Sequence, residues 1–172
     1  RHQHRRVHLE EPAGVEEGII RGLYPLAKGS GKKNAPRVQL LGSGTILREV
    51  EAAADLLKEY GVVADVWSAT SFNELRRDGL DVERWNLLHP SEPPRTAWVT
   101  QQLGGKPGPV IAATDYMKTY ADQIRQFVPA PFVALGTDGF GRSDTREKLR
   151  EFFEVDRRWV ALAALKALAD AG

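Results

Sequence analysis

The chain contains no cysteine, and that absence removes several classes of chemistry at once. A protein without thiols has no disulfide framework, no thiolate metal site and no cysteine nucleophile. It also has no apolar stretch near the ~20 residues that a membrane span requires. The lack of cysteine fits a cytoplasmic protein, and the sequence predicts no membrane partner.

An excess of charge of either sign is also missing. Lys and Arg total 24, Asp and Glu total 23, and the formal net charge is +1. This balance gives no reason to expect nucleic acid or an anionic membrane as a partner. Residues 1–8 are locally basic and rich in histidine, but no apolar region follows, so they are not a secretory signal. The pair His2 and His4 could chelate a metal weakly or belong to a nucleic-acid arm; a loose terminus is the favoured interpretation.

What the chain does have is the composition of one soluble globular domain. Its 172 residues are 42% hydrophobic and 27% charged, enough for a single core. Residues 1–34 are rich in glycine and proline and are interpreted as a lead-in segment and loop, with a flexible start. Within them, Ile19, Ile20, Leu23 and Tyr24 could pack on a core. Residues 35–172 are expected to form a single α/β domain.

Strand-like and helix-like patterns alternate along residues 35–172. Strands are predicted over 38–41, 62–67, 109–114 and 132–135. Helices are predicted between them: one capped by Thr45 and stopped by Gly61, one capped by Ser71 and interrupted at Asp78-Gly79, one around 117–127, and a last one from Asp156. Residues 96–103 fit either a short helix or a strand, and the helix is the favoured interpretation. This order predicts an α/β fold, an open, mostly parallel sheet in three layers with helices on both faces.

Ligands in such folds bind beyond the carboxyl ends of the strands, so the candidate residues are those that follow each strand. Gly42, Ser43 and Gly44 follow the first strand and resemble a dinucleotide fingerprint, but Leu47 stands where the third glycine is required. The turn could still hold a phosphate or carboxylate on exposed N–H groups. A structural tight turn is the favoured interpretation.

Two carboxylates follow later strands. Asp115 and Asp138 could act as an acid–base pair or bind a cation; we favour the alternative that each orders a turn or caps a helix. Arg142 and Ser143 suggest a phosphate site, but an ion pair for Arg142 and a helix cap from Ser143 or its neighbour Asp144 are favoured.

Two further side chains have residue types that allow special roles. His89 could be a catalytic base, but its position at a helix end favours contact with helix carbonyls. Phe140, in the glycine-rich turn, is predicted to be an apolar plug within the domain or at a subunit contact.

The turn from Gly136 to Arg146 has an uncommon sequence, which resembles that of a known family. It reads Gly-Thr-Asp-Gly-Phe-Gly-Arg-Ser-Asp-Thr-Arg. It resembles the C-terminal domain of the homodimeric, bacterial-type pyruvate dehydrogenase family, the thiamine-diphosphate-dependent first component of the pyruvate dehydrogenase complex. The resemblance extends over nearly all of residues 16–172 through further blocks in the same order: Val38–Arg48, Asp65–Leu75, Arg77–Gly79, Glu83–Pro90, Ala113–Lys118 and Leu135–Asp144.

The resemblance implies a transketolase C-terminal-domain-like fold and a noncatalytic role in an enzyme that decarboxylates pyruvate oxidatively. In that family, thiamine diphosphate and magnesium are bound by other domains, so no catalytic, cofactor or metal residue is carried over to this chain. The implied partners are the remaining domains, the homodimer mate and the dihydrolipoamide acetyltransferase core. The opening residues, 1–9, do not resemble the family, and the family usually continues beyond Gly172, so a fragment is expected.

Two other functions stay open on the residues themselves. One is a regulatory module that binds a small anion or nucleotide at the strand ends. The other is a stand-alone enzyme that uses Asp115, Asp138 and His89.

Overall fold

The computed structural model describes residues 14–172, so the basic run at residues 1–8 lies outside the described part. Its centre is a five-stranded sheet in the order β1-β3-β2-β4-β5. The strands are β1 (Leu23–Ala27), β2 (Arg37–Gly42), β3 (Val63–Ala69), β4 (Val110–Ala113) and β5 (Phe132–Leu135). Strands β2 to β5 run parallel to one another, which confirms the four predicted strands and the parallel crossover.

Strand β1 was not predicted. It pairs antiparallel with β3, with Leu23 opposite Ala69, and it lies at the edge of the sheet. Pro25 in its middle argues against a strand by local rules, but an edge strand tolerates proline because one side of it needs no ladder hydrogen bond. Leu23 and Tyr24 are buried as expected, whereas Ile20 is exposed. Part of the segment 1–34 therefore belongs to the sheet.

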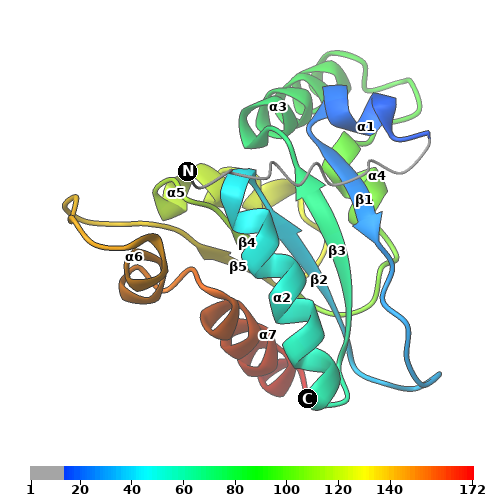
Figure 1. Ribbon diagram of the computed structural model, residues 1–172. Helices are drawn as coiled ribbons and strands as arrows, with labels where there is room; N and C mark the ends of the chain where they lie inside the picture. Colours follow the sequence, from blue (N-terminus) through cyan, green and yellow to red (C-terminus); the bar gives the residue numbers. More distant parts are fainter. Residues whose placement is uncertain (1–13) are drawn as a thin grey trace.

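Helices cover both faces of the sheet, which confirms the three-layer α/β class (Figure 1). On one face α2 and α7 pack together over the core formed by Val38, Leu40, Val50 and Val160. On the other face Leu41, Trp67, Phe72 and Phe127 form a second core. The helices are α1 (Glu16–Arg21), α2 (Leu47–Glu59), α3 (Phe72–Leu88), α4 (Trp98–Leu103), α5 (Lys118–Asp122), α6 (Arg146–Phe152) and α7 (Arg157–Ala171), with 3₁₀ turns η1 (Gly44–Ile46) and η2 (Arg125–Phe127).

Several predicted helix ends are confirmed. The Ser71 hydroxyl accepts the backbone N–H of Glu74 at the start of α3, and the Asp156 carboxylate accepts N–H groups at the start of α7. Gly61 ends the α2 turn with φ +72°, a conformation that favours glycine. Thr45, however, is not a cap: it lies within η1, and α2 begins without a side-chain cap.

The predicted interruption at Asp78-Gly79 is wrong, because α3 continues through both residues. A Cβ at Gly79 would lie 2.6 Å from ring atoms of Phe127, so glycine is needed there for close packing. The Asp78 carboxylate accepts hydrogen bonds from Arg21 and from the backbone N–H of Trp98. Both residues therefore serve contacts between elements that are distant in sequence.

Candidate functional site

The carboxyl ends of β2 and β4 are neighbours, and they bring Ser43 and Thr114 together. The Ser43 hydroxyl donates to Thr114 Oγ1 at 2.9 Å, and the backbone N–H of Tyr116 donates to the same oxygen at 3.2 Å. Thr114 is fully buried. The polar side chains that follow these two strands therefore hydrogen-bond the turn after β2 to the turn after β4.

The glycines of the first turn have different roles. A Cβ at Gly42 would lie 2.8 Å from the Cα of Leu47, so Gly42 allows α2 to approach β2 closely. Gly44 has φ +53°, and a Cβ there would meet the Asp115 carboxylate oxygens at ordinary contact distances. Leu47 itself packs in the core below. This geometry is that of a tight structural turn.

Asp115 lies beside that turn. Its Oδ2 accepts the Thr45 hydroxyl at 3.3 Å, and its backbone carbonyl accepts the Thr137 hydroxyl at 2.7 Å. The three turns after β2, β4 and β5 therefore meet at Asp115.

Asp138 is placed differently. Its Oδ1 accepts the backbone N–H of Lys118 at 2.7 Å, at the first residue of α5. The carboxylate orders the start of this helix, which is the favoured interpretation of Asp138 from the sequence. Asp115 and Asp138 share the carboxyl edge, but each is engaged by a separate turn.

The expected roles of the residues after Phe140 need correction. Arg142 forms no ion pair with a carboxylate within residues 14–172; its guanidinium lies over the Phe152 ring, 4.5 Å from the centroid. The cap of α6 is Thr145, whose hydroxyl accepts the N–H of Lys148, and not Ser143 or Asp144. Asp144 instead accepts the N–H of Thr145 at 2.7 Å.

Phe140 does not plug the domain that the structure describes, because 97% of it is exposed. His89 ends α3, with Nδ1 2.7 Å from the Trp85 carbonyl oxygen and its ring stacked on the Trp85 ring at 4.4 Å. This is the helix-carbonyl contact expected from the sequence.

An open cavity of about 380 Å³ lies at the carboxyl edge. Two of the seven candidate residues, Asp115 and Arg142, line it. Gly42, Ser43, Gly44, Asp138 and Ser143 do not. The remaining polar lining comes from Thr45, Thr137, Arg146 and Arg150, and the apolar lining from Ile46, Leu149, Phe153 and Val155. A cavity lined by both arginines and apolar side chains suits a small anion that has an apolar part.

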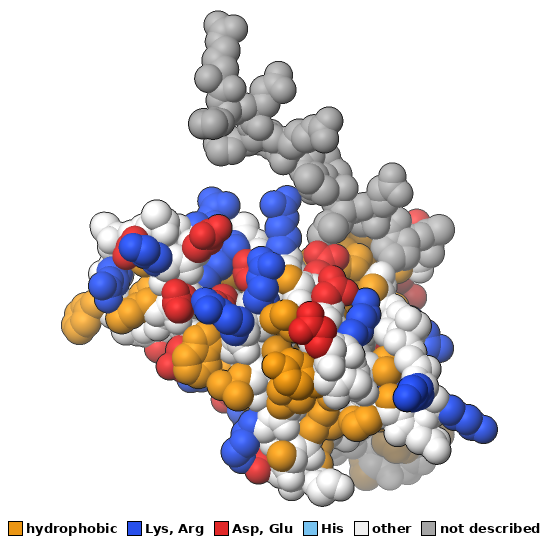
Figure 2. Space-filling model, turned by 60° about the horizontal axis from the view of Figure 1, so that its bottom comes forward, with side chains coloured by type: hydrophobic (Ala, Val, Ile, Leu, Met, Phe, Trp, Pro, Cys, Tyr) orange, Lys and Arg blue, Asp and Glu red, His pale blue; other side chains and the backbone are white. Residues whose placement is uncertain are grey.

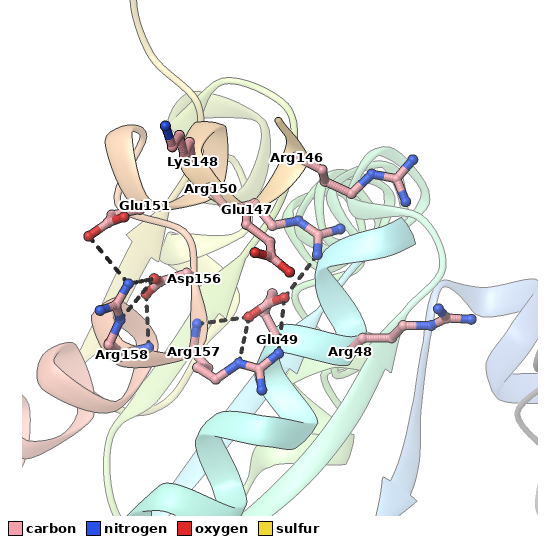
Figure 3. A pocket seen from close by; sticks show the side chains of 10 residues that line it. All are labelled: Arg48, Glu49, Arg146, Glu147, Lys148, Arg150, Glu151, Asp156, Arg157 and Arg158. Atoms are coloured by element: carbon pink, nitrogen blue, oxygen red, sulfur yellow. Dashed lines mark hydrogen bonds and ion pairs between the residues drawn. The ribbon is translucent and has the colours of Figure 1, made fainter. Parts of the chain in front are cut away.

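A second cavity, of about 680 Å³, is lined by ten charged side chains (Figure 3). At its centre Glu49 of α2, with a buried side chain, accepts hydrogen bonds from Arg150 at 2.8 Å and from the Arg157 side chain at 3.0 Å. The backbone N–H of Arg157 also donates to it at 3.1 Å. Helices α2, α6 and α7 are therefore joined through one carboxylate.

Burial raises the pKa of the Glu49 carboxyl, but the hydrogen bonds and charge of Arg157, with the charge of Arg150, outweigh it. The pKa therefore lies below its ordinary value, and Glu49 is ionised at neutral pH. Figure 3 shows a second ion-pair group beside it, in which Arg158 contacts Asp156 and Glu151. The charges nearest the centre of this cavity thus neutralise one another.

Sequence reasoning missed the Glu49 group. Its partners are 101 and 108 residues away, so no local spacing could have indicated them. The one available signal was the charged stretch 146–158 that follows the glycine-rich turn.

On the face seen in Figure 2, basic and acidic side chains are intermixed, with apolar side chains between them. That face has no broad patch of one charge, in keeping with the net charge of +1. Among residues 14–172, no helix is long and apolar enough to cross a membrane. The same residues contain no group of three or more His, Cys, Asp or Glu side chains that could hold a metal ion.

The sequence matches known proteins closely. The model of the transketolase-like TK C-terminal domain matches residues 22–156. The chain is 66% identical to the pyruvate dehydrogenase E1 component of Cupriavidus necator over 96% of its own length, and 55% identical to that of Escherichia coli K12 over 94%. In each case it spans 18% of the relative's length.

Solved structures of transketolases share the fold. The transketolase of Campylobacter jejuni superposes with a TM-score of 0.59 at 19% identity, covering 91% of this chain and 20% of that one. An inactive tetramer of a split-gene transketolase superposes with a TM-score of 0.54. The family model covers well over half of the chain, and its curated relatives are pyruvate dehydrogenase E1 components, so the chain belongs to the transketolase-like TK C-terminal domain family.

Proposed function

We propose that this chain is the C-terminal domain of a pyruvate dehydrogenase (acetyl-transferring) E1 component, and that it supports oxidative decarboxylation of pyruvate by completing the subunit and its dimer. The observation that carries the proposal is 66% identity to an E1 component over 96% of the chain, combined with 18% coverage of that relative. At the carboxyl edge, the polar side chains hydrogen-bond neighbouring turns. That use is structural, and the role we propose is that of a noncatalytic scaffold.

The E1 relatives and the transketolase-like fold suggest a thiamine-diphosphate enzyme that also uses magnesium. The carboxyl edge of this chain does not fit that cofactor. The Asp138 carboxylate accepts the N–H of Lys118, and the Asp115 carboxylate accepts the Thr45 hydroxyl. The turns after β4 and β5 are joined by the hydrogen bond from the Thr137 hydroxyl to the Asp115 carbonyl. A pyrophosphate–magnesium group needs several free oxygen ligands directed at one point. We therefore assign the cofactor to the parts of the enzyme outside this chain.

The remaining partners follow from the same proposal. They are the other domains of the E1 polypeptide, a second E1 subunit and the dihydrolipoamide acetyltransferase core of a cytoplasmic complex.

The test compares the longer E1 polypeptide with and without this domain. We expect pyruvate-dependent carbon dioxide release and dimer formation from the complete polypeptide, and loss of both from the truncated one. This chain alone should release no carbon dioxide, and thiamine diphosphate with magnesium should leave its melting temperature unchanged, since a ligand raises that temperature by binding the native state. A cofactor-dependent shift in this chain alone would refute the proposal.

A second candidate is a regulatory site for a small anion or nucleotide. The specific observation in its favour is the 380 Å³ cavity, lined by Arg142 and Arg146 and by the backbone of Gly139 and Gly141. Titration of the chain with inorganic phosphate and with a nucleotide tests it. Saturable binding that is lost in Arg146→Gln supports this function, and equal affinity of the variant and the parent chain excludes it.

A further inference from the structure

Three apolar side chains stand exposed at the carboxyl edge of the sheet. Tyr116 and Met117 follow β4 and are 62% and 60% exposed, and Phe140 follows β5 and is 97% exposed. We call these three residues the carboxyl-edge patch. A single exposed apolar side chain is ordinary, but three large ones on two turns that are hydrogen-bonded to each other fit a contact surface.

The backbone beneath the patch is held firmly. The N–H of Thr137 donates to the Tyr116 carbonyl at 2.8 Å, and the Asp138 carboxylate accepts the N–H of Lys118 at 2.7 Å. A Cβ at Gly136 would lie 2.5 Å from the backbone nitrogen of Lys118, so the two segments touch. The Tyr116 ring also packs against Tyr120, with centroids 4.8 Å apart. Tyr116 and Met117 are therefore presented on an ordered base, which lowers the entropy lost when a partner binds.

Charged side chains accompany the patch in the sequence. Asp115, Asp138 and Arg142 lie on the same two turns. An apolar centre with a polar rim is the usual composition of a protein–protein contact.

The topology indicates which partner lies there. The Leu23–Ala69 pairing and the hydrogen bonds from Thr70 and Ser71 to the Gly22 carbonyl place α1 and the start of β1 at the carboxyl edge. In a longer E1 polypeptide, the chain that precedes α1 thus reaches this domain at the same edge as the patch. Strands β1 and β4 are three strand spacings apart in the sheet, a distance of ~14 Å. This is less than the ~30 Å diameter of a small domain, so one preceding domain is wide enough to reach both strands.

We propose that the carboxyl-edge patch is the surface on which this domain docks against the preceding part of the E1 polypeptide. The inference rests on the proposed function, which supplies that preceding part: the chain spans 18% of each curated relative named above. On docking, the patch becomes buried against that preceding part of the polypeptide, and the protruding Phe140 anchors the contact. The solvent exposure of Phe140 here is the exposure of an undocked surface.

The test uses Met117, which is the one methionine of the chain and needs no substitution. Hydrogen peroxide converts an accessible methionine to its sulfoxide, and peptide mass spectrometry follows the reaction. Tyr60→Met supplies a matched control, because Tyr60 is 67% exposed at the end of α2, at the opposite edge of the sheet. We expect oxidation of Met117 to be ~10-fold slower in the complete E1 polypeptide than in this chain alone, while the methionine introduced by Tyr60→Met reacts at the same rate in both.

A second variant tests the anchor. Phe140→Asp places a charge in the contact, so it should restore fast oxidation of Met117 in the complete polypeptide and leave the oxidation rate in this chain alone unchanged. Equal Met117 oxidation in the complete polypeptide and the isolated chain would overturn the proposal. Protection that arises in the isolated chain as its concentration rises would also overturn it, by assigning the patch to a second copy of the domain.

These readouts do not depend on turnover. An active E1 polypeptide with fully reactive Met117 would leave the proposed function intact and refute the docking surface. An inactive polypeptide with protected Met117 would refute the proposed function and support the docking surface.

Discussion

Replacing Glu49 with glutamine should weaken the junction of α2, α6 and α7 measurably. The side chain of Glu49 is 9% exposed and accepts charge-assisted hydrogen bonds from Arg150 and Arg157. Removing one partner of a buried ion pair typically destabilises a protein by about 3–5 kcal/mol. The loss here should be smaller, about 2–3 kcal/mol, because the half-exposed Arg157 can turn to water and glutamine still accepts one hydrogen bond.

The assay is thermal unfolding of the isolated chain, followed by the fluorescence of its four tryptophans. At pH 7 the variant should melt about 4–12 °C below the parent chain, the shift expected for that energy in a domain of this size. Glu51→Gln is the matched control in the same helix. Burial raises the pKa of Glu51, with Asp55 adding to the rise and Arg48 opposing it, so its ionised form gains nothing from folding. This control should be as stable as the parent chain, or slightly more stable.

The pH dependence supplies a second check. Because the pKa of Glu49 is lower in the folded chain than in the unfolded one, its contribution is present above the unfolded pKa of about 4.3 and is lost as pH falls through the folded value. The stability difference between parent and Glu49→Gln should therefore narrow below that pH. A melting shift under about 1 °C at pH 7, or a difference of equal size at pH 7 and in acid, would refute this account of Glu49.

Three further substitutions test the packing. Gly79→Ala should destabilise the chain by about 1–2 kcal/mol despite alanine's better helix propensity, because its Cβ meets the Phe127 ring at 2.6 Å; stabilisation in urea unfolding would show that α3 and η2 are not in contact. Gly42→Ala should cost about 1–3 kcal/mol, since its Cβ would lie 2.8 Å from the Leu47 backbone, and an unchanged urea midpoint would contradict that close approach. Phe140→Ala should leave the unfolding free energy of the isolated chain within about 0.5 kcal/mol, and a larger loss in calorimetry would mean that the ring is packed within the domain.

Much of the fold could be predicted because its signals are local. The parallel strands are short apolar runs bounded by glycine, proline and polar residues, and the caps at Ser71 and Asp156 depend on neighbouring N–H groups. The wrong prediction at Asp78-Gly79 depended on distant partners. Asp78-Gly79 has the local signature of a break, yet Phe127 and Trp98 hold both residues in a continuous helix.

The candidate site divides in the same way. The order of strands and turns was enough to place Asp115 and Asp138 at one edge of the sheet. The direction of each carboxylate was not predictable, since Thr45 and Lys118 come from other turns. Thr145 took the cap expected of Ser143 or Asp144, a choice among adjacent residues that depends on where α6 begins.

By itself, then, the sequence determined the class of fold, because periodicity and turn residues are properties of the chain alone. It also determined the family, because several uncommon sequence blocks occur in the family's order. The tertiary structure decided what sequence spacing cannot: that β1 completes the sheet, that Glu49 joins three helices, and that Phe140 points outward. Each of these features depends on which surfaces come into contact when the chain folds. Contacts between residues about a hundred positions apart leave no local pattern to read.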